Sequence, residues 1–108
     1  MAVSLAMNSR QVTRQMADCL RAALGAETVW LFGSQARGDA DADSDYDLLA
    51  VVPSSPLNRY QRAVAARRAL SEFNMPMDIV VLTKDEWNRE SKAPSSLAST
   101  VAREGIAM

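Results

Sequence analysis

Hydrophobic residues recur along the chain with two different periods, and each period predicts one kind of element. Between Ser9 and Leu24 they return every three or four residues, as they do along one face of an amphipathic helix. Shorter runs of consecutive apolar residues, bounded by glycine, proline or polar residues, are typical of buried strands. The pattern predicts strands over residues 29–32, 45–52 and 77–83, and helices over residues 9–24, 56–73, 83–90 and 96–104.

Local signals indicate where these helices begin and end. Gly25 follows the first helical pattern, at a position where glycine commonly ends a helix. Ser55 and Pro56 suit the N-cap and first position of the second helix, and Thr83 with Glu86 forms a capping-box pattern for the third. A stripe of apolar residues in the second helix is expected to face the core, with its arginines facing solvent. The stripe consists of Leu57, Tyr60, Val64, Leu70 and Phe73, and the arginines are Arg59, Arg62, Arg67 and Arg68.

The order of the elements predicts the class of fold. A strand, a turn, a second strand, a helix and a third strand, framed by further helices, are typical of an α/β sandwich with a small mixed sheet. The chain has 108 residues, of which 48% are hydrophobic and 23% charged, as in a soluble globular domain. That length suffices for one core but not for separate catalytic and substrate-binding domains. We therefore expect residues 1–108 to form a single domain.

The composition excludes several classes of function. The formal net charge is −1, so the chain lacks the basic footprint of a nucleic-acid-binding protein. Its apolar runs are too short for a membrane span, and residues 1–8 lack the pattern of a signal peptide. The single cysteine cannot form an intramolecular disulfide, which fits a location in the reducing cytoplasm. Because histidine is absent, chemistry must rest on carboxylates, hydroxyls, arginine or lysine, and metal.

Residues 31–52 carry the groups best suited to chemistry. Gly33 has no Cβ, so the backbone can turn sharply there and a phosphate can approach it closely. The Ser34 hydroxyl and the N–H groups that follow can form an anion cradle. Asp45 and Asp47 lie two residues apart on the predicted strand, so both carboxylates project from one face. Such a pair suits Mg²⁺ when water and substrate phosphate complete its shell, and the combination indicates phosphoryl or nucleotidyl transfer.

The loop between the first two predicted strands is rich in charge. Arg37 has two interpretations, an ion pair with a loop aspartate or neutralisation of triphosphate charge through its planar guanidinium. Asp39, Asp41 and Asp43 alternate with alanine, but the run lacks the glycine and distant glutamate of an EF-hand loop. We interpret these three as solvated charges. Ser44 is expected to cap the turn that leads into the second strand.

Two runs in this stretch resemble a known signature. Residues 33–38 read GSQARG and residues 44–48 read SDYDL, which is similar to the GSxARG and SDxDL signature of the DNA polymerase β-like nucleotidyltransferase superfamily. Within it, the chain looks most like the minimal nucleotidyltransferases (MNT), the small partners of HEPN-domain proteins. The resemblance implies that Gly33, Ser34 and Arg37 bind the nucleotide, and that Asp45 and Asp47 are catalytic, metal-binding carboxylates.

The resemblance also implies a third carboxylate, on the strand next to the one that carries the aspartate pair. Asp78 is the second residue of the predicted strand over residues 77–83 and matches that position. Three carboxylates can hold two Mg²⁺ ions, one activating the attacking oxygen and one binding the triphosphate and leaving pyrophosphate. In polymerase-like members the third carboxylate can also take the proton of the nucleophile.

Three hypotheses about function follow. The first is an enzyme that transfers AMP from ATP to a hydroxyl, and the resemblance implies a tyrosine of an HEPN RNase toxin, with this chain as the antitoxin. The second is a nucleotidyltransferase of a small-molecule acceptor, and the third is a non-catalytic module that masks its partner by contact. Because the site is expected on an open sheet face, a second protomer or a separate chain is expected to supply the acceptor.

Overall fold

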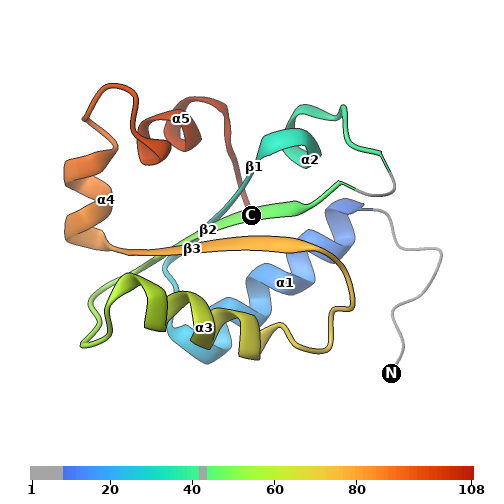
Figure 1. The fold of residues 1–108 in the computed structure, drawn as a ribbon, viewed down its shortest axis with the longest axis horizontal. Helices are drawn as coiled ribbons and strands as arrows, with labels where there is room; N and C mark the ends of the chain where they lie inside the picture. Colours follow the sequence, from blue (N-terminus) through green and yellow to red (C-terminus); the bar gives the residue numbers. More distant parts are fainter. Residues whose placement is uncertain (1–8, 42–43) are drawn as a thin grey trace.

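The computed structural model describes residues 9–41 and 44–108, and Figure 1 shows its elements. Along the chain they are α1 (Ser9–Leu24), β1 (Thr28–Phe32), α2 (Gly33–Arg37), β2 (Tyr46–Val52), α3 (Arg59–Ala69), β3 (Met77–Thr83), α4 (Lys84–Glu90), α5 (Leu97–Glu104) and β4 (Ile106–Ala107). Helices lie on both faces of one four-stranded sheet, so the predicted α/β sandwich is confirmed. None of the described helices is long and apolar enough to cross a membrane.

The sheet is mixed, as predicted, with the strand order β3-β2-β1-β4. β2 runs antiparallel to β1 and parallel to β3, which follows it along the chain after α3. Residues 48–52 of β2 are all buried, because helices cover both faces of this strand. That double burial explains why β2 reads as a continuous apolar run rather than an alternating one. β4, which the sequence pattern did not predict, adds two residues to the other edge of β1.

Two hydrophobic clusters fill the two interfaces of the sandwich. On the face covered by α1 and α3, Met16 and Leu20 of α1 pack in one cluster with Leu48 of β2. On the face covered by α4 and α5, Leu49 of β2 packs in a second cluster with Val101 of α5. Since successive strand residues point to opposite faces, this alternation assigns each residue of β2 to one helical layer.

A stacked pair of tryptophans joins α4 to the sheet. The rings of Trp30 on β1 and Trp87 on α4 have centroids 5.5 Å apart and planes inclined by 27°. Both side chains pack against the cluster on the α4 and α5 face. The pair therefore contributes apolar contact area at the point where α4 leaves β3.

The predicted first helix is confirmed over its whole length, Ser9–Leu24. Val12, Met16 and Leu20 are buried at the helical spacing read from the sequence. Gly25 has a φ of +68°, and its N–H donates to Arg21 O at 3.0 Å, which ends the helix. Local periodicity and a glycine stop are sufficient to define this element.

The predicted start of the helix after β2 is wrong by three residues. α3 begins at Arg59 rather than at Pro56, because Asn58 is its N-cap. The Asn58 side chain accepts from the N–H of Gln61 at 2.8 Å, and Gln61 Oε1 accepts from the N–H of Asn58 at 3.0 Å. This reciprocal capping box satisfies two backbone donors at once. Ser55 instead caps a turn, in which its Oγ accepts from the N–H of Leu57 at 3.1 Å.

The predicted inward face of α3 is also partly wrong. Leu70 and Phe73 are buried as expected, but Leu57 and Tyr60 retain 40% and 78% exposure. Arg62, expected on the solvent side, is buried instead, with 7% exposure. Leu97 of α5 is also exposed, whereas Ala98 and Val101 face the core.

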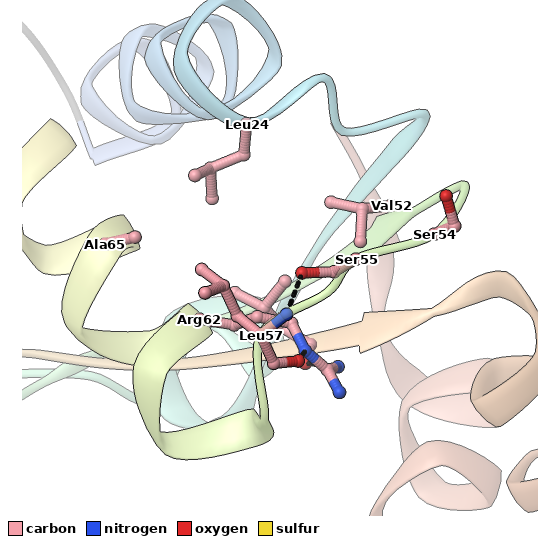
Figure 2. A pocket seen from close by; sticks show the side chains of 8 residues that line it. Leu24, Val52, Ser54, Ser55, Leu57, Arg62 and Ala65 are labelled. Atoms are coloured by element: carbon pink, nitrogen blue, oxygen red, sulfur yellow. Dashed lines mark hydrogen bonds between the residues drawn. The ribbon is translucent and has the colours of Figure 1, made fainter.

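Arg62 is buried because it satisfies groups on three segments. Its Nε donates to Leu57 O at 2.9 Å, as Figure 2 shows, and its Nη1 donates to Val81 O of β3 at 2.8 Å. The same guanidinium binds Glu86 of α4 through both nitrogens, at 2.7 and 3.2 Å. Glu86 also accepts from the N–H of Thr83 at 2.8 Å in the capping box of α4. One buried ion pair therefore connects α3, β3 and α4.

Replacing Arg62 with alanine is expected to lower the free energy of unfolding by about 3 kcal/mol, because two backbone carbonyls lose their side-chain donor and Glu86 loses the cation nearest to it. Urea denaturation followed by circular dichroism measures this change. Arg14→Ala, at an exposed position of α1, is the matched control and is expected to stay within about 0.5 kcal/mol of the unsubstituted protein. Equal stability of the two variants would contradict the role assigned to Arg62.

The same ion pair predicts a loss of stability in acid. The Arg62 hydrogen bond is the main cause that lowers the pKa of Glu86 from 4.5 to about 2. Between these values the unfolded chain binds the proton more readily, so the stabilisation is complete above pH 4.5 and is lost as the pH falls towards 2. Urea titrations across this window should show a shallower decline for Glu86→Gln than for the unsubstituted protein, and parallel curves would contradict the assignment.

Candidate active site

The candidate site is built where β1 ends and the chain turns into α2. Gly33 follows directly after Phe32 and has a φ of +72°, a conformation that favours glycine. A Cβ at this position would overlap Asp47 Oδ2 and lie 3.2 Å from Asp47 Cγ. The Asp47 carboxylate therefore lies against the Gly33 backbone, in space that any larger residue would fill.

Strand pairing brings two of the predicted carboxylates side by side. Asp47 of β2 pairs with Phe32 of β1 on one side and with Asp78 of β3 on the other. Directly paired residues of neighbouring strands project from the same face of a sheet. Asp45 lies one residue before β2, which begins at Tyr46 rather than at Asp45 as predicted. The partly buried Tyr46 packs towards α1, so it points away from the aspartates, as the strand period predicts.

Charge and burial act on Asp47 together. Burial raises the pKa of Asp47 above its ordinary value, and the charges of Asp78 and Asp45 raise it further. The guanidinium of Arg37 acts in the opposite direction and favours the ionised form. An added cation would oppose the same repulsion, because an opposite charge within a few ångströms stabilises a carboxylate.

The donor set partly fits the metal site expected from the sequence. The charges of Asp78 and Asp45 both act on the Asp47 carboxylate, and carboxylate oxygens are the type of ligand that Mg²⁺ prefers. Within residues 9–41 and 44–108, however, no three acidic, cysteine or histidine side chains lie close enough together to form a metal-ligating group. Binding of Mg²⁺ by Asp45, Asp47 and Asp78 therefore stays a prediction.

The segment predicted to hold phosphate forms the short helix α2. Phe32 is its N-cap residue and makes no side-chain hydrogen bond to the first turn. Ser34 lies in that turn and is partly buried, and its carbonyl accepts from the N–H of Gly38 at 3.0 Å. Gly38 has a φ of +83°, a conformation that favours glycine, and it turns the chain back after α2. Ser34 therefore lies beside Gly33 at the end of β1, and its binding of nucleotide stays a prediction.

Arg37 pairs with a loop aspartate, which is one of its two predicted roles. Its Nε pairs with Asp39 Oδ2 at 3.2 Å, and both side chains are exposed. Its charge also reaches Asp47, since it acts to lower the pKa of that carboxyl. An exposed ion pair contributes about 0–1 kcal/mol, so a triphosphate can compete with Asp39 for the guanidinium. Binding of nucleotide by Arg37 stays a prediction.

Local hydrogen bonds order the described part of the loop. Ser44 Oγ accepts from the N–H of Asp41 at 2.9 Å and donates to Asp41 Oδ1 at 3.2 Å. Gln35 of α2 reaches Ser44 O with its Nε2 at 3.4 Å. Asp39 and Asp41 are exposed, in agreement with their interpretation as solvated charges, whereas Asp43 lies outside the described residues. The expected turn at Ser44 is therefore present directly before Asp45.

The sequence interpretation missed Arg67, which lies next to the third aspartate. Its Nη2 is 4.0 Å from Asp78 Oδ1 and donates to Met77 O at 3.3 Å. The available signal was the short, proline-containing turn after α3, which returns the start of β3 to the last turn of the helix. Asp78 keeps a side-chain exposure of 72% beside this arginine, so a second molecule can reach it.

A separate pocket near the other end of β2 is too small for a nucleotide. It lies between α1, α3 and the turn after β2, and Figure 2 shows Leu24, Val52 and Ala65 among its lining residues. Its volume is about 50 Å³, whereas pockets that bind small molecules measure about 300–1,000 Å³. Val52 is five residues beyond Asp47 on β2, a separation of about 17 Å. The pocket is therefore no part of the candidate site.

Comparisons with known proteins agree with this geometry. The family model for the nucleotidyltransferase domain matches residues 13–104. A nucleotidyltransferase candidate from Sulfolobus solfataricus superposes with a TM-score of 0.62 at 19% identity, over 96% of this chain and 90% of that one. A search of curated proteins gave no significant match.

Two further solved structures with a similar fold come from toxin–antitoxin complexes. One is a toxin–antitoxin with AMP-PNP, with a TM-score of 0.65 at 21% identity over 87% of this chain and 69% of that one. The other is a mutant of the toxin–antitoxin MntA-HpeT, in which two aspartates two positions apart are replaced by glutamate. Its TM-score is 0.64 at 20% identity, with the same coverage of 87% and 69%. Because the family model covers most of the chain, this protein belongs to the nucleotidyltransferase domain family.

Proposed function

We propose that this nucleotidyltransferase transfers AMP from ATP to a hydroxyl group on a partner protein, and that it acts as the antitoxin of a toxin–antitoxin pair. The observation that carries the proposal is the Asp47 carboxylate, seated on Gly33 and paired across the sheet with Asp78. The acceptor in this proposal is a tyrosine of an HEPN-type RNase toxin, as the resemblance implies. The two toxin–antitoxin structures support it, since they share the fold over 87% of this chain.

Each site residue has a stated part in the proposed reaction. Gly33, Ser34 and the backbone N–H groups of α2 hold the triphosphate, and Arg37 neutralises part of its charge. Mg²⁺ bound by Asp45, Asp47 and Asp78, as two ions in the full arrangement, would supply further charge neutralisation at the phosphates. Like-charge repulsion at Asp47 favours this interpretation, because a shared cation stabilises the ionised form of carboxylates that repel one another.

The acceptor hydroxyl approaches from the exposed side of β3. Its oxygen forms the new bond to the α-phosphorus while the bond to the bridging oxygen breaks and pyrophosphate leaves. Asp78 takes the hydroxyl proton, a role that its exposure and its place directly beside Asp47 support. Since little covalent chemistry falls to the protein, holding acceptor and nucleotide in line accounts for most of its contribution.

The proposal is tested by incubating the protein with Mg²⁺ and α-³²P-labelled ATP, with and without the product of the neighbouring open reading frame. Label is expected on the neighbouring product, and it should disappear when Mg²⁺ is chelated. In Asp47→Asn the transfer rate should fall at least about a hundredfold, because a metal ligand contributes several kcal/mol to the transition state. Asp85→Asn, an exposed position on α4, is the matched control with the same chemical change.

Loss of activity in Asp47→Asn should not come from unfolding. The raised pKa of Asp47 means that its ionised form is less favoured in the folded protein than in the unfolded chain. The neutral asparagine is therefore expected to leave stability at pH 7 equal or higher, as measured by urea denaturation. Transfer at an undiminished rate in this variant would refute the metal assignment, and a stable complex without any label would favour neutralisation by contact.

Gly33→Ala tests the close approach of Asp47 to the backbone. Both the positive φ and the overlap with Asp47 oppose a Cβ here, so transfer should fall at least about tenfold and stability by about 1–3 kcal/mol. Gly25→Ala is the matched control, since its φ is +68° but a Cβ there would meet nothing within 4 Å. Gly25→Ala should lower stability because of its positive φ, but it should leave the transfer rate unchanged. Equal transfer rates of the two variants, measured with labelled ATP, would show that the close contact of Gly33 with Asp47 is not needed for transfer.

A further inference from the structure

α3 has a second apolar face that the core does not use. Its inner face packs through Ala66, and the segment that follows adds Leu70 and Phe73 to the same cluster. Leu57 and Tyr60 lie outside the core, and Tyr60 keeps 78% of its surface exposed. These are residues that the sequence pattern predicts for the core stripe, and the structure instead leaves both of them exposed.

The exposed face forms a groove, which we call the α3 groove. Its volume is about 290 Å³, and it is lined by Leu57, Tyr60, Gln61, Val64, Ala65 and Arg68. Four of these residues are hydrophobic, one is an amide and one is a cation. Tyrosine and arginine are the residue types that most often anchor protein–protein contacts, because each combines large area with directed polar groups.

Charge on α3 restricts what can occupy the groove. The helix contains four arginines and no acidic residue. Arg62 is paired with Glu86, Arg59 with Glu86 and Glu90, and Arg67 lies beside Asp78. The guanidinium of Arg68 makes no hydrogen bond or ion pair with the described part of the chain, although that of its neighbour Arg67 does. The one cation in the groove therefore lacks a counter-charge.

We propose that the α3 groove docks an amphipathic helix of the acceptor protein, with apolar anchors for Tyr60 and Val64 and a carboxylate for Arg68. This inference rests on the proposed function only in naming the acceptor as the occupant. A second copy of this chain fits the groove less well, because none of the residues that line the groove is acidic, so a two-fold contact would give Arg68 no carboxylate from the other groove. An acidic helix satisfies the free cation and covers the apolar residues at the same time.

The position of the groove relates docking to transfer. Tyr60 and Arg68 are eight residues apart on α3, a distance of about 12 Å along the helix axis. Arg67, next to Arg68, is 4.0 Å from Asp78 at the exposed edge of the sheet. A helix bound along the groove therefore ends at the β3 edge of the sheet. The acceptor hydroxyl must reach around this edge, because Asp78 projects from the opposite face, which α4 and α5 cover.

The test measures binding of the neighbouring gene product to the full chain by isothermal titration calorimetry, without nucleotide. Tyr60→Ala and Arg68→Glu are each expected to weaken binding at least about tenfold, and the arginine variant should also reduce the dependence of binding on salt. Leu97→Ala, which removes an exposed apolar side chain of α5, and Arg89→Glu, which reverses an exposed charge of α4, are the controls, because both lie on the other face of the sheet from the α3 groove. The controls should bind within about twofold of the unsubstituted protein.

Unchanged affinity in both groove variants would overturn the proposal. So would failure of the unsubstituted protein to bind the product, and so would a dimer of this chain that dissociates on Tyr60→Ala in sedimentation experiments, since the occupant would then be a second copy. Labelling with ATP on the same proteins separates the two proposals. Weakened binding in the groove variants without label in any sample supports docking and contradicts transfer. Label on the product together with unchanged binding in the groove variants supports transfer and contradicts docking.

Discussion

The Asp47 carboxylate occupies the volume in which any residue other than glycine at position 33 would place its Cβ. The positive φ of Gly33 also lets the chain pass from β1 into α2 without a connecting loop. Phe32 pairs with Asp47, and Asp47 pairs with Asp78. The register of the three strands therefore fixes the position of the Gly33 turn relative to two of the carboxylates. The geometry of the candidate site is thus a property of the sheet rather than of flexible loops.

That arrangement has an energetic cost that a structural role alone does not explain. Burial and two neighbouring carboxylates raise the pKa of Asp47, so its charged form opposes folding at neutral pH. Arg37 offsets part of this repulsion while pairing with Asp39 in an exposed ion pair. Sites that store such repulsion are common where a cation or a charged substrate binds. The membership of the chain in the nucleotidyltransferase domain family is consistent with that interpretation.

α3 shows how one helix can serve two different surfaces. Towards the sheet it buries Ala66, and it places Arg62 in an ion pair with Glu86 that connects α3, β3 and α4. Away from the sheet it exposes Tyr60 and the groove beside it. A helix with apolar residues on both sides has no single hydrophobic face, so its orientation is set by specific polar partners rather than by its hydrophobic pattern.

The sequence by itself determined the elements that local physics controls, together with the family. Periodicity and end signals predicted α1 and β3 with their correct bounds, and the motif around Gly33 and the aspartates predicted the nucleotidyltransferase class that the family match confirms. Tertiary structure decided the burial of Arg62, whose partner Glu86 is 24 residues further along the chain. It also decided the pairing of β4 with β1 and the approach of Arg67 to Asp78. A local pattern treats an arginine as solvent-facing, because the groups that offset its burial are brought to it only when the chain folds.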